Sequence, residues 1–310
     1  MISKPELLIT AGTVEEAKRF IQAGADAVLI GEAAFGMRLP GDVTIQDLEE
    51  LVPYVHAKGA KVYAAVNNVF DNEALPEVEK YLAAISAIGV DGAVYGDPAI
   101  LRMVNKAEFK LPLHWNAEMT TTNYATANYW ASRGAVRAVL ARELNLEETL
   151  EFKRHAKLEV QVQVHGLTNI YHSRRSLVAN YVEHLGKDAN SVDRSMDNGL
   201  FLIEQERQEE RYPIYEDSNG THVMSSDDIC MLEDLHELLK GSIDSLKIEG
   251  LLKSAEYNET VVRAYRQVID AYCADPDSYK FNDEMLEPIR RLQDPSRELS
   301  FGFFYKEQVY

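Results

Sequence analysis

Short apolar runs alternate with helix-like stretches along most of this chain, and each run has the length of a single strand. Repeated strand–helix alternation predicts a parallel sheet with helices packed against it. The chain contains eight such runs, at residues 7–11, 27–31, 61–66, 92–96, 113–117, 136–141, 159–164 and 245–250. Eight parallel strands are the number that closes a barrel. The sequence therefore predicts an α/β fold, a parallel (β/α)8 barrel of the TIM type.

A doubly wound open sheet is the alternative that shares this alternation. Open sheets that bind dinucleotides carry a glycine-rich loop directly after their first strand. Here the first run is followed by Gly12-Thr13-Val14-Glu15-Glu16, which is typical of a capped helix start and lacks that fingerprint. The barrel is favoured for this reason.

Two segments depart from the repeat. Residues 167–228 separate the seventh and eighth predicted strands and include short β-like runs. Loops that follow strands form the functional face of such barrels, so we expect a β-rich insertion over the mouth. Residues 276–310 are rich in charge and end in aromatic residues, and we expect a C-terminal tail docked on the barrel, with a subunit contact as the alternative. The predicted organisation is one barrel domain, 1–275, with its insertion, followed by this tail.

Composition limits the partners and the compartment. The net charge is −18, which opposes non-specific binding to polyanions. No apolar run approaches the ~20 residues that a membrane helix needs, and the N-terminus has no signal-peptide pattern. The two cysteines, Cys230 and Cys273, lie in helix-like contexts and have no disulfide or metal spacing. We expect a cytoplasmic protein with reduced thiols and no membrane partner.

Polar residues follow most of the predicted strands and should meet at the barrel mouth, where active sites of this fold lie. The candidates for substrate binding are Glu32, Asn67, Asn116, Arg142, Lys247 and Glu249. The candidates for catalysis are Glu118, Arg142, Glu143 and His165. A cation in this set could face a carboxylate of a small polar ligand. The same residues could also form a self-neutralised ion-pair network without chemistry.

The sequence offers no self-evident catalytic device. His165 and His172 lie in one segment without a nearby pair of carboxylates, so no metal site can be assembled from spacing. No Gly-x-Ser-x-Gly elbow is present, and no cysteine follows a predicted barrel strand. We therefore expect no metal site.

Several segments, taken together and in order, resemble the collagenase-like U32 peptidase family. The matching blocks are Pro5-Glu6-Leu7-Leu8, Gly31-Glu32-Ala33-Ala34-Phe35-Gly36, Lys61-Val62-Tyr63-Ala64-Ala65-Val66-Asn67, Glu118-Met119-Thr120-Thr121, Ala141-Arg142-Glu143-Leu144, Met224-Ser225-Ser226-Asp227-Asp228 and Asp244-Ser245-Leu246-Lys247-Ile248-Glu249-Gly250. The aromatic segment 301–305 also resembles the end of the family's sequences.

The chain departs from the family where the family's cysteines lie. Family members with four cysteines hold an iron–sulfur cluster, and two of those cysteines follow a His-Gly pair seven residues apart. In this chain Asn169 and Ser176 occupy these two positions, and the segment 188–199 has no cysteine for the second pair. Cluster iron needs thiolate ligands, typically four. The resemblance therefore implies a family member without the cluster. Leu251 also stands where the family usually has an arginine.

The resemblance implies two alternative functions, and the polar residues at the barrel mouth leave a third open. The favoured one is an accessory, cluster-less subunit in the formation of 5-hydroxyuridine at the tRNA wobble position, a reaction linked to prephenate. The partner would be a cysteine-complete paralogue of the U32 family, with tRNA contacted within the complex. The second alternative is a U32-type peptidase, and the third is an independent barrel enzyme acting on a small molecule.

Overall fold

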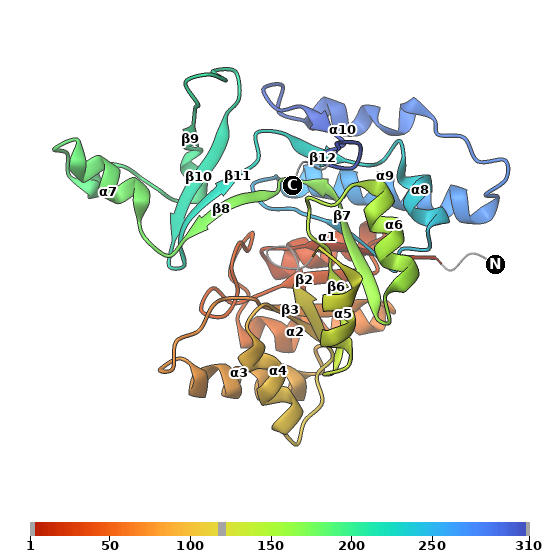
Figure 1. Cartoon of the computed structure of the whole chain (residues 1–310), viewed down its shortest axis with the longest axis horizontal. Helices are drawn as coiled ribbons and strands as arrows, with labels where there is room; N and C mark the ends of the chain where they lie inside the picture. The colour runs from red at the N-terminus through yellow and green to blue at the C-terminus, as the bar shows by residue number, and fades with distance from the viewer. Residues whose placement is uncertain (1–3, 117–121, 308–310) are drawn as a thin grey trace.

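The computed structural model describes residues 4–116 and 122–307, and its centre is a closed barrel of eight parallel strands (Figure 1). The order is β13-β1-β2-β3-β4-β5-β6-β7, and β7 pairs with β13 to close the ring. The strands are β1 (Glu6–Thr10), β2 (Ala27–Ile30), β3 (Lys61–Val66), β4 (Gly92–Tyr95), β5 (Leu113–Asn116), β6 (Ala135–Val139), β7 (Glu159–Gly166) and β13 (Ser245–Ile248). The prediction of a (β/α)8 barrel is confirmed.

Helices connect the strands and cover the outside of the barrel. They are α1 (Val14–Ala23), α2 (Ile45–Ala57), α3 (Leu75–Ile88), α4 (Pro98–Lys106), α5 (Tyr124–Ala131), α6 (Leu146–His155), α8 (Leu235–Lys240) and α9 (Ala255–Ala274). Local sequence fixes several starts: Thr44 and Asn145 each form a capping box with the acidic residue three positions later. Across the described ranges, no helix is both long and apolar enough to cross a membrane.

The strands divide their side chains between two apolar layers with a period of two, as pleated strands must. In β2, Val28 and Ile30 pack outward against the helices, whereas Ala27 and Leu29 belong to the inner layer. The inner layer is Leu8, Ala27, Leu29, Tyr63, Ala65, Val94 and Val139. Below it, at the N-terminal end of the strands, Arg137 and Glu6 form a buried ion pair. The barrel interior is therefore a packed core with polar groups at both ends.

The insertion after β7 forms a separate four-stranded antiparallel sheet, as the sequence predicts. Its order is β8-β11-β10-β9, and it projects from the barrel together with a helix, α7 (Figure 1). The elements are β8 (Asn169–Ser173), α7 (Leu177–His184), the 3₁₀ turns η1 (Ala189–Ser191) and η2 (Met196–Asn198), β9 (Phe201–Leu202), β10 (Tyr212–Asp217) and β11 (Gly220–Met224). Asn219, in the turn between β10 and β11, donates to the carbonyls of Ala33 and Gly36 at 3.2 Å and so ties the sheet to the loop after β2.

The chain after α9 returns to the end of β7. It contains η3 (Asp283–Met285), α10 (Glu287–Leu292) and β14 (Leu299–Ser300). β14 pairs with β12 (Asp228–Cys230), and β12 pairs antiparallel with the end of β7. Phe304 is buried, and its carbonyl accepts from the Leu146 amide at 2.9 Å. Cys230 therefore lies in a strand, and the prediction of a helix there is wrong, because β7 and β14 supply backbone partners on both sides of β12. Cys273 lies in α9.

Candidate functional site

Four of the predicted binding residues meet at the mouth of the barrel. Asn67, Asn116, Lys247 and Glu249 line one cavity at the C-terminal ends of the strands. The cavity measures only about 40 Å³, which is room for little more than a water molecule. The residues are thus brought together as predicted, but without space between them for a substrate.

Two charged groups at the mouth, Lys247 and Glu249, pair with each other. Lys247 Nζ lies 3.1 Å from Glu249 Oε2, and both side chains are about nine-tenths buried. Thr10 donates its hydroxyl to Glu249 Oε1 at 2.7 Å, and the Leu251 amide donates to the same oxygen at 3.2 Å. A buried ion pair with its remaining lone pairs satisfied is a stable arrangement. The geometry is that of a structural network.

An apolar cluster lies directly over these groups. Leu167, Tyr215, Met224 and Leu251 form it, and each is at most 2% exposed. Three of the four, Leu167, Met224 and Leu251, also line the mouth cavity. Leu251 is the residue that replaces the arginine expected from the family resemblance. Leu251 thus adds an apolar side chain to a cavity whose described cations are Arg38 and Lys247.

The remaining candidates lie at or beyond the edge of the mouth. Arg142 lines a separate cavity of about 20 Å³, and its Nε is 3.4 Å from Glu143 Oε1. Glu32 follows β2 but does not line the mouth cavity; burial, and then the nearby Asp42, raise the pKa of its carboxyl. Glu118 lies outside the described residues. The described catalytic candidates, Arg142, Glu143 and His165, are therefore not assembled around one point.

His165 points away from the mouth. The pairing of β7 with β13 shifts register after Lys247, so that His165 lies opposite Ile248, a residue of the outer layer. Its ring is fully buried against α9, with Nε2 3.0 Å from the Tyr257 hydroxyl and Nδ1 3.4 Å from the Tyr265 hydroxyl. Burial lowers the pKa of His165 to about 3, so the ring is neutral at physiological pH.

Gly166 makes this turn of the chain possible. Its φ is +94°, which side chains disfavour, and a Cβ there would lie 2.2 Å from the Glu249 carbonyl oxygen. The His-Gly pair therefore has a packing role: the histidine anchors the strand to α9, and the glycine lets the insertion leave beside the end of β13.

Stability should fall as pH decreases from 6.5 to 4 because of His165. The unfolded histidine, with a pKa near 6.5, takes up a proton in this range, whereas the folded one, with a pKa of about 3, does not. The unfolded state then binds more protons, and the free energy of unfolding drops by about 3 kcal/mol over the window. Urea unfolding at several pH values measures this slope. His165→Met should flatten it, whereas the exposed His184→Gln should leave it unchanged. Equal slopes in H165M and the parent would contradict the argument.

The two positions of the missing cysteines do not fit an iron–sulfur cluster. Asn169 is buried in β8 beside the mouth, and its carboxamide oxygen has no hydrogen-bond partner. Ser176 precedes α7 and makes no side-chain capping bond. Neither side chain supplies a thiolate. Within residues 4–116 and 122–307, no group of three or more His, Cys, Asp or Glu side chains could hold a metal ion.

Sequence reasoning missed the other polar residues of the mouth. Gln161 and Gln163 of β7 and Thr10 of β1 line the cavity with the predicted set. Gln163 Nε2 donates to the Leu167 carbonyl at 2.8 Å and so fixes the chain where it leaves the barrel. The strict alternation of glutamine and valine from 160 to 164 was the available signal, because it marks the inward face of the strand.

The fold and the mouth define a β/α-barrel protein whose pocket is closed by its own insertion. The chain belongs to peptidase family U32, whose model matches residues 12–309. The chain is 44% identical to tRNA hydroxylation protein P2 of Bacillus subtilis (strain 168), over all of both chains. It is 32% identical to tRNA hydroxylation protein P1 of the same organism, over 99% of this chain and 74% of that protein.

Solved structures support the fold. The structure of the U32 peptidase Mk0906 matches with a TM-score of 0.50 at 18% identity, over 80% of this chain and 93% of that one. At this level of identity the similarity concerns the arrangement of the chain alone.

Proposed function

We propose that this chain is an accessory subunit in tRNA wobble-uridine hydroxylation, acting without a cluster of its own beside a cysteine-complete U32 paralogue. The observation that carries the proposal is the closed mouth. The cavity of about 40 Å³ is capped by Leu251 and Met224, and Asn169 stands beside it where the family has a cysteine. A barrel modified in this way is suited to binding a partner rather than to holding a substrate.

The proposed reaction is taken from the names of two similar proteins. The two relatives described above, P1 and P2, are both named for tRNA hydroxylation, and both come from Bacillus subtilis. The full-length match to P2 supports the same role for this chain, and P1 is the model for its paralogous partner. A role on tRNA puts the chain in the cytoplasm, and the partner would supply the iron–sulfur chemistry and the principal RNA contacts.

The projecting insertion offers a surface for such a partner. Ile170, Tyr171, Tyr181, Leu185 and Phe201 are each at least 43% exposed there. Exposed apolar side chains on elements that project from the barrel are available for contact with a partner. This supports a complex with a partner protein.

Mass spectrometry of tRNA nucleosides tests the proposal. A strain lacking this chain should lose 5-hydroxyuridine-derived wobble nucleosides, and the intact gene should restore them. The cysteine-complete paralogue alone should not restore these nucleosides. An unchanged nucleoside profile in the deletion strain would contradict the proposed role.

A paired substitution at the mouth distinguishes an accessory subunit from a barrel enzyme. Lys247→Met with Glu249→Gln removes both charges of the buried pair, which limits the cost in stability. If the mouth performs no chemistry, the folded double variant restores the wobble nucleosides to the level of the intact gene. Loss of the nucleosides with normal folding and normal abundance would indicate an independent active site instead.

A further inference from the structure

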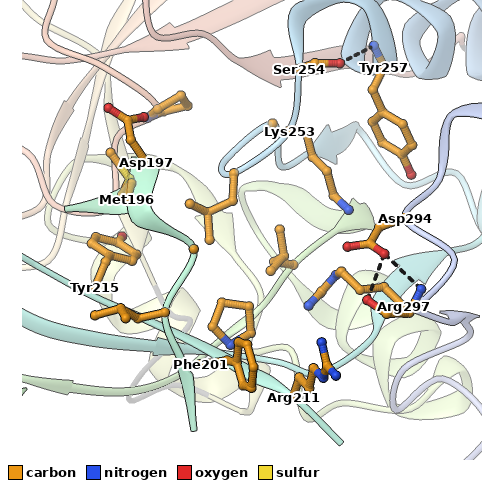
Figure 2. Close-up of a pocket in the computed structure, with 18 of the residues that line it drawn as sticks. Met196, Asp197, Phe201, Arg211, Tyr215, Lys253, Ser254, Tyr257, Asp294 and Arg297 are labelled. Atoms are coloured by element: carbon orange, nitrogen blue, oxygen red, sulfur yellow. Dashed lines mark hydrogen bonds between the residues drawn. The ribbon is translucent and has the colours of Figure 1, made fainter. Parts of the chain in front are cut away.

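A second cavity lies outside the barrel, between the insertion, the loop after β13 and the chain that follows α10. It measures about 620 Å³, within the usual range for small-molecule sites. Its walls come from the η2–β10 region, residues 250–257 and residues 292–297 (Figure 2). Three segments far apart in the sequence therefore meet around one space.

Two cations at this cavity, Lys253 and Arg297, form ion pairs with the same buried carboxylate. Lys253 Nζ lies 2.5 Å from Asp228 Oδ2, and Arg297 Nη2 lies 2.9 Å from Asp228 Oδ1. Asp228 is fully buried, and the side chains of Lys253 and Arg297 are 8% and 10% exposed. Arg297 also donates to the carbonyls of Ser225 and Asp227. Asp228 thus pairs with both cations, and these contacts hold their side chains in place without a ligand.

A third cation, Arg211, faces the same part of the cavity in Figure 2. Its guanidinium lies 4.8 Å from the ring of Phe201, and the described part of the chain places no carboxylate within 4.0 Å of it. Its neighbour Arg207, by contrast, pairs with Glu204 and Glu210. Asp294, between Lys253 and Arg297, accepts from Ser296 and adds one compensating charge. On this side Lys253, Arg297 and Arg211 outnumber the carboxylates of Asp228 and Asp294 by one. The cavity is also lined by Asp197 and by Glu16, whose carboxylate accepts from the Gly12 amide.

The rest of the wall is largely apolar. Phe201, Pro213, Ile214 and Leu252 line it, and Tyr257 packs its ring 5.0 Å from Lys253 Nζ. Apolar walls with a few convergent polar groups are the usual composition of ligand sites. Figure 2 shows Asp197 on the opposite side from the three cations, so the charged end of an anion has one preferred orientation.

We propose that this cavity binds a small oxyanion, a carboxylate or phosphate carried on an apolar body. Arg211 supplies the free charge, and Lys253 and Arg297 supply fixed donors. A polyanion is a poorer fit, because the segment 204–210 beside Arg211 carries four glutamates and one arginine, and the chain has a net charge of −18. The inference goes beyond the proposed function, since it concerns a cavity outside the barrel mouth.

Isothermal titration of the full chain with phenylacetate and phenyl phosphate tests this proposal, with benzyl alcohol as the uncharged probe. At least one oxyanion should bind saturably, and benzyl alcohol should bind at least about tenfold more weakly. The better of the two oxyanions then identifies the head group. Arg211→Gln should weaken that binding about tenfold or more, because one charge-assisted hydrogen bond is lost.

Arg207→Gln is the matched control, because Arg207 lies on the same exposed segment but pairs with its own glutamates and does not line the cavity. It should change the affinity less than twofold. Three results would overturn the proposal: no saturable binding of either oxyanion, equal losses in R211Q and R207Q, or binding confined to an anticodon stem-loop RNA that depends on Arg211. None of them depends on the nucleoside profile, so failure here is distinguishable from failure of the proposed function.

Discussion

Replacement of Asp228 by asparagine should lower the free energy of unfolding by about 3–5 kcal/mol, the range for breaking a buried ion pair from one side. The carboxylate is fully buried and accepts from Lys253, Arg297 and the Gln293 side chain at 2.5 to 3.3 Å. These cations hold the pKa of Asp228 down at about 2 against the effect of burial, so the group is charged at neutral pH. Asparagine keeps the shape but leaves two buried cations facing one uncharged amide.

Chemical denaturation of D228N measures the loss, and Asp227→Asn is the matched control. Asp227 is the neighbouring carboxylate, partly exposed, and it accepts a hydrogen bond from the Ser300 hydroxyl. Asp227→Asn should lower the free energy of unfolding by less than about 1 kcal/mol, as surface substitutions usually do. Hydrogen exchange should rise between 283 and 300 in D228N alone, because Asp228 holds that segment to β12 and to the loop after β13. Equal losses in both variants would contradict this role.

The sequence predicts the barrel well because each strand carries its own signal. Leu7–Ala11 and Ala27–Ile30 are short, apolar and bounded by glycine, and both form strands within a residue or two of the prediction. The insertion is predicted only in outline. Its sheet depends on pairings such as Tyr171 with Val223, across some fifty residues, and no local pattern specifies such a register.

The sequence predicts residues of the candidate site only where they lie at the end of a predicted barrel strand. Asn67, Asn116, Lys247 and Glu249 meet at the mouth because each lies at or just after the end of a parallel strand. His165 occupies an equivalent place in the sequence, but one shift of register turns its side chain to the outer layer. The cavity around Arg211 could not be predicted at all, because its three walls come from the insertion, the loop after β13 and the C-terminal segment.

The second large effect is expected at the N-terminal end of the barrel strands. Arg137→Leu should lower the free energy of unfolding by about 3–5 kcal/mol. The guanidinium is 2% exposed and reaches Glu6 at 2.5 Å and Glu159 at 2.7 Å. Glu6 in turn accepts from the hydroxyls of Tyr63 and Ser245. The network thus joins β1, β3, β6, β7 and β13. Leucine would leave the Glu6 carboxylate, whose side chain is 11% exposed, with only the more distant and half-exposed Lys61, whose Nζ lies 3.9 Å away.

A double-mutant cycle separates the value of this pair from the cost of leaving one charge behind. Glu6→Leu alone should also destabilise strongly, because it leaves Arg137 with only Glu159, which is half exposed and therefore well solvated. Arg137→Leu with Glu6→Leu removes both charges, and apolar replacement of a buried pair is often nearly neutral. The double variant should therefore lose less than the sum of the single losses, by about 2 kcal/mol or more. Additive losses would show that the two side chains act on the barrel independently, through packing alone.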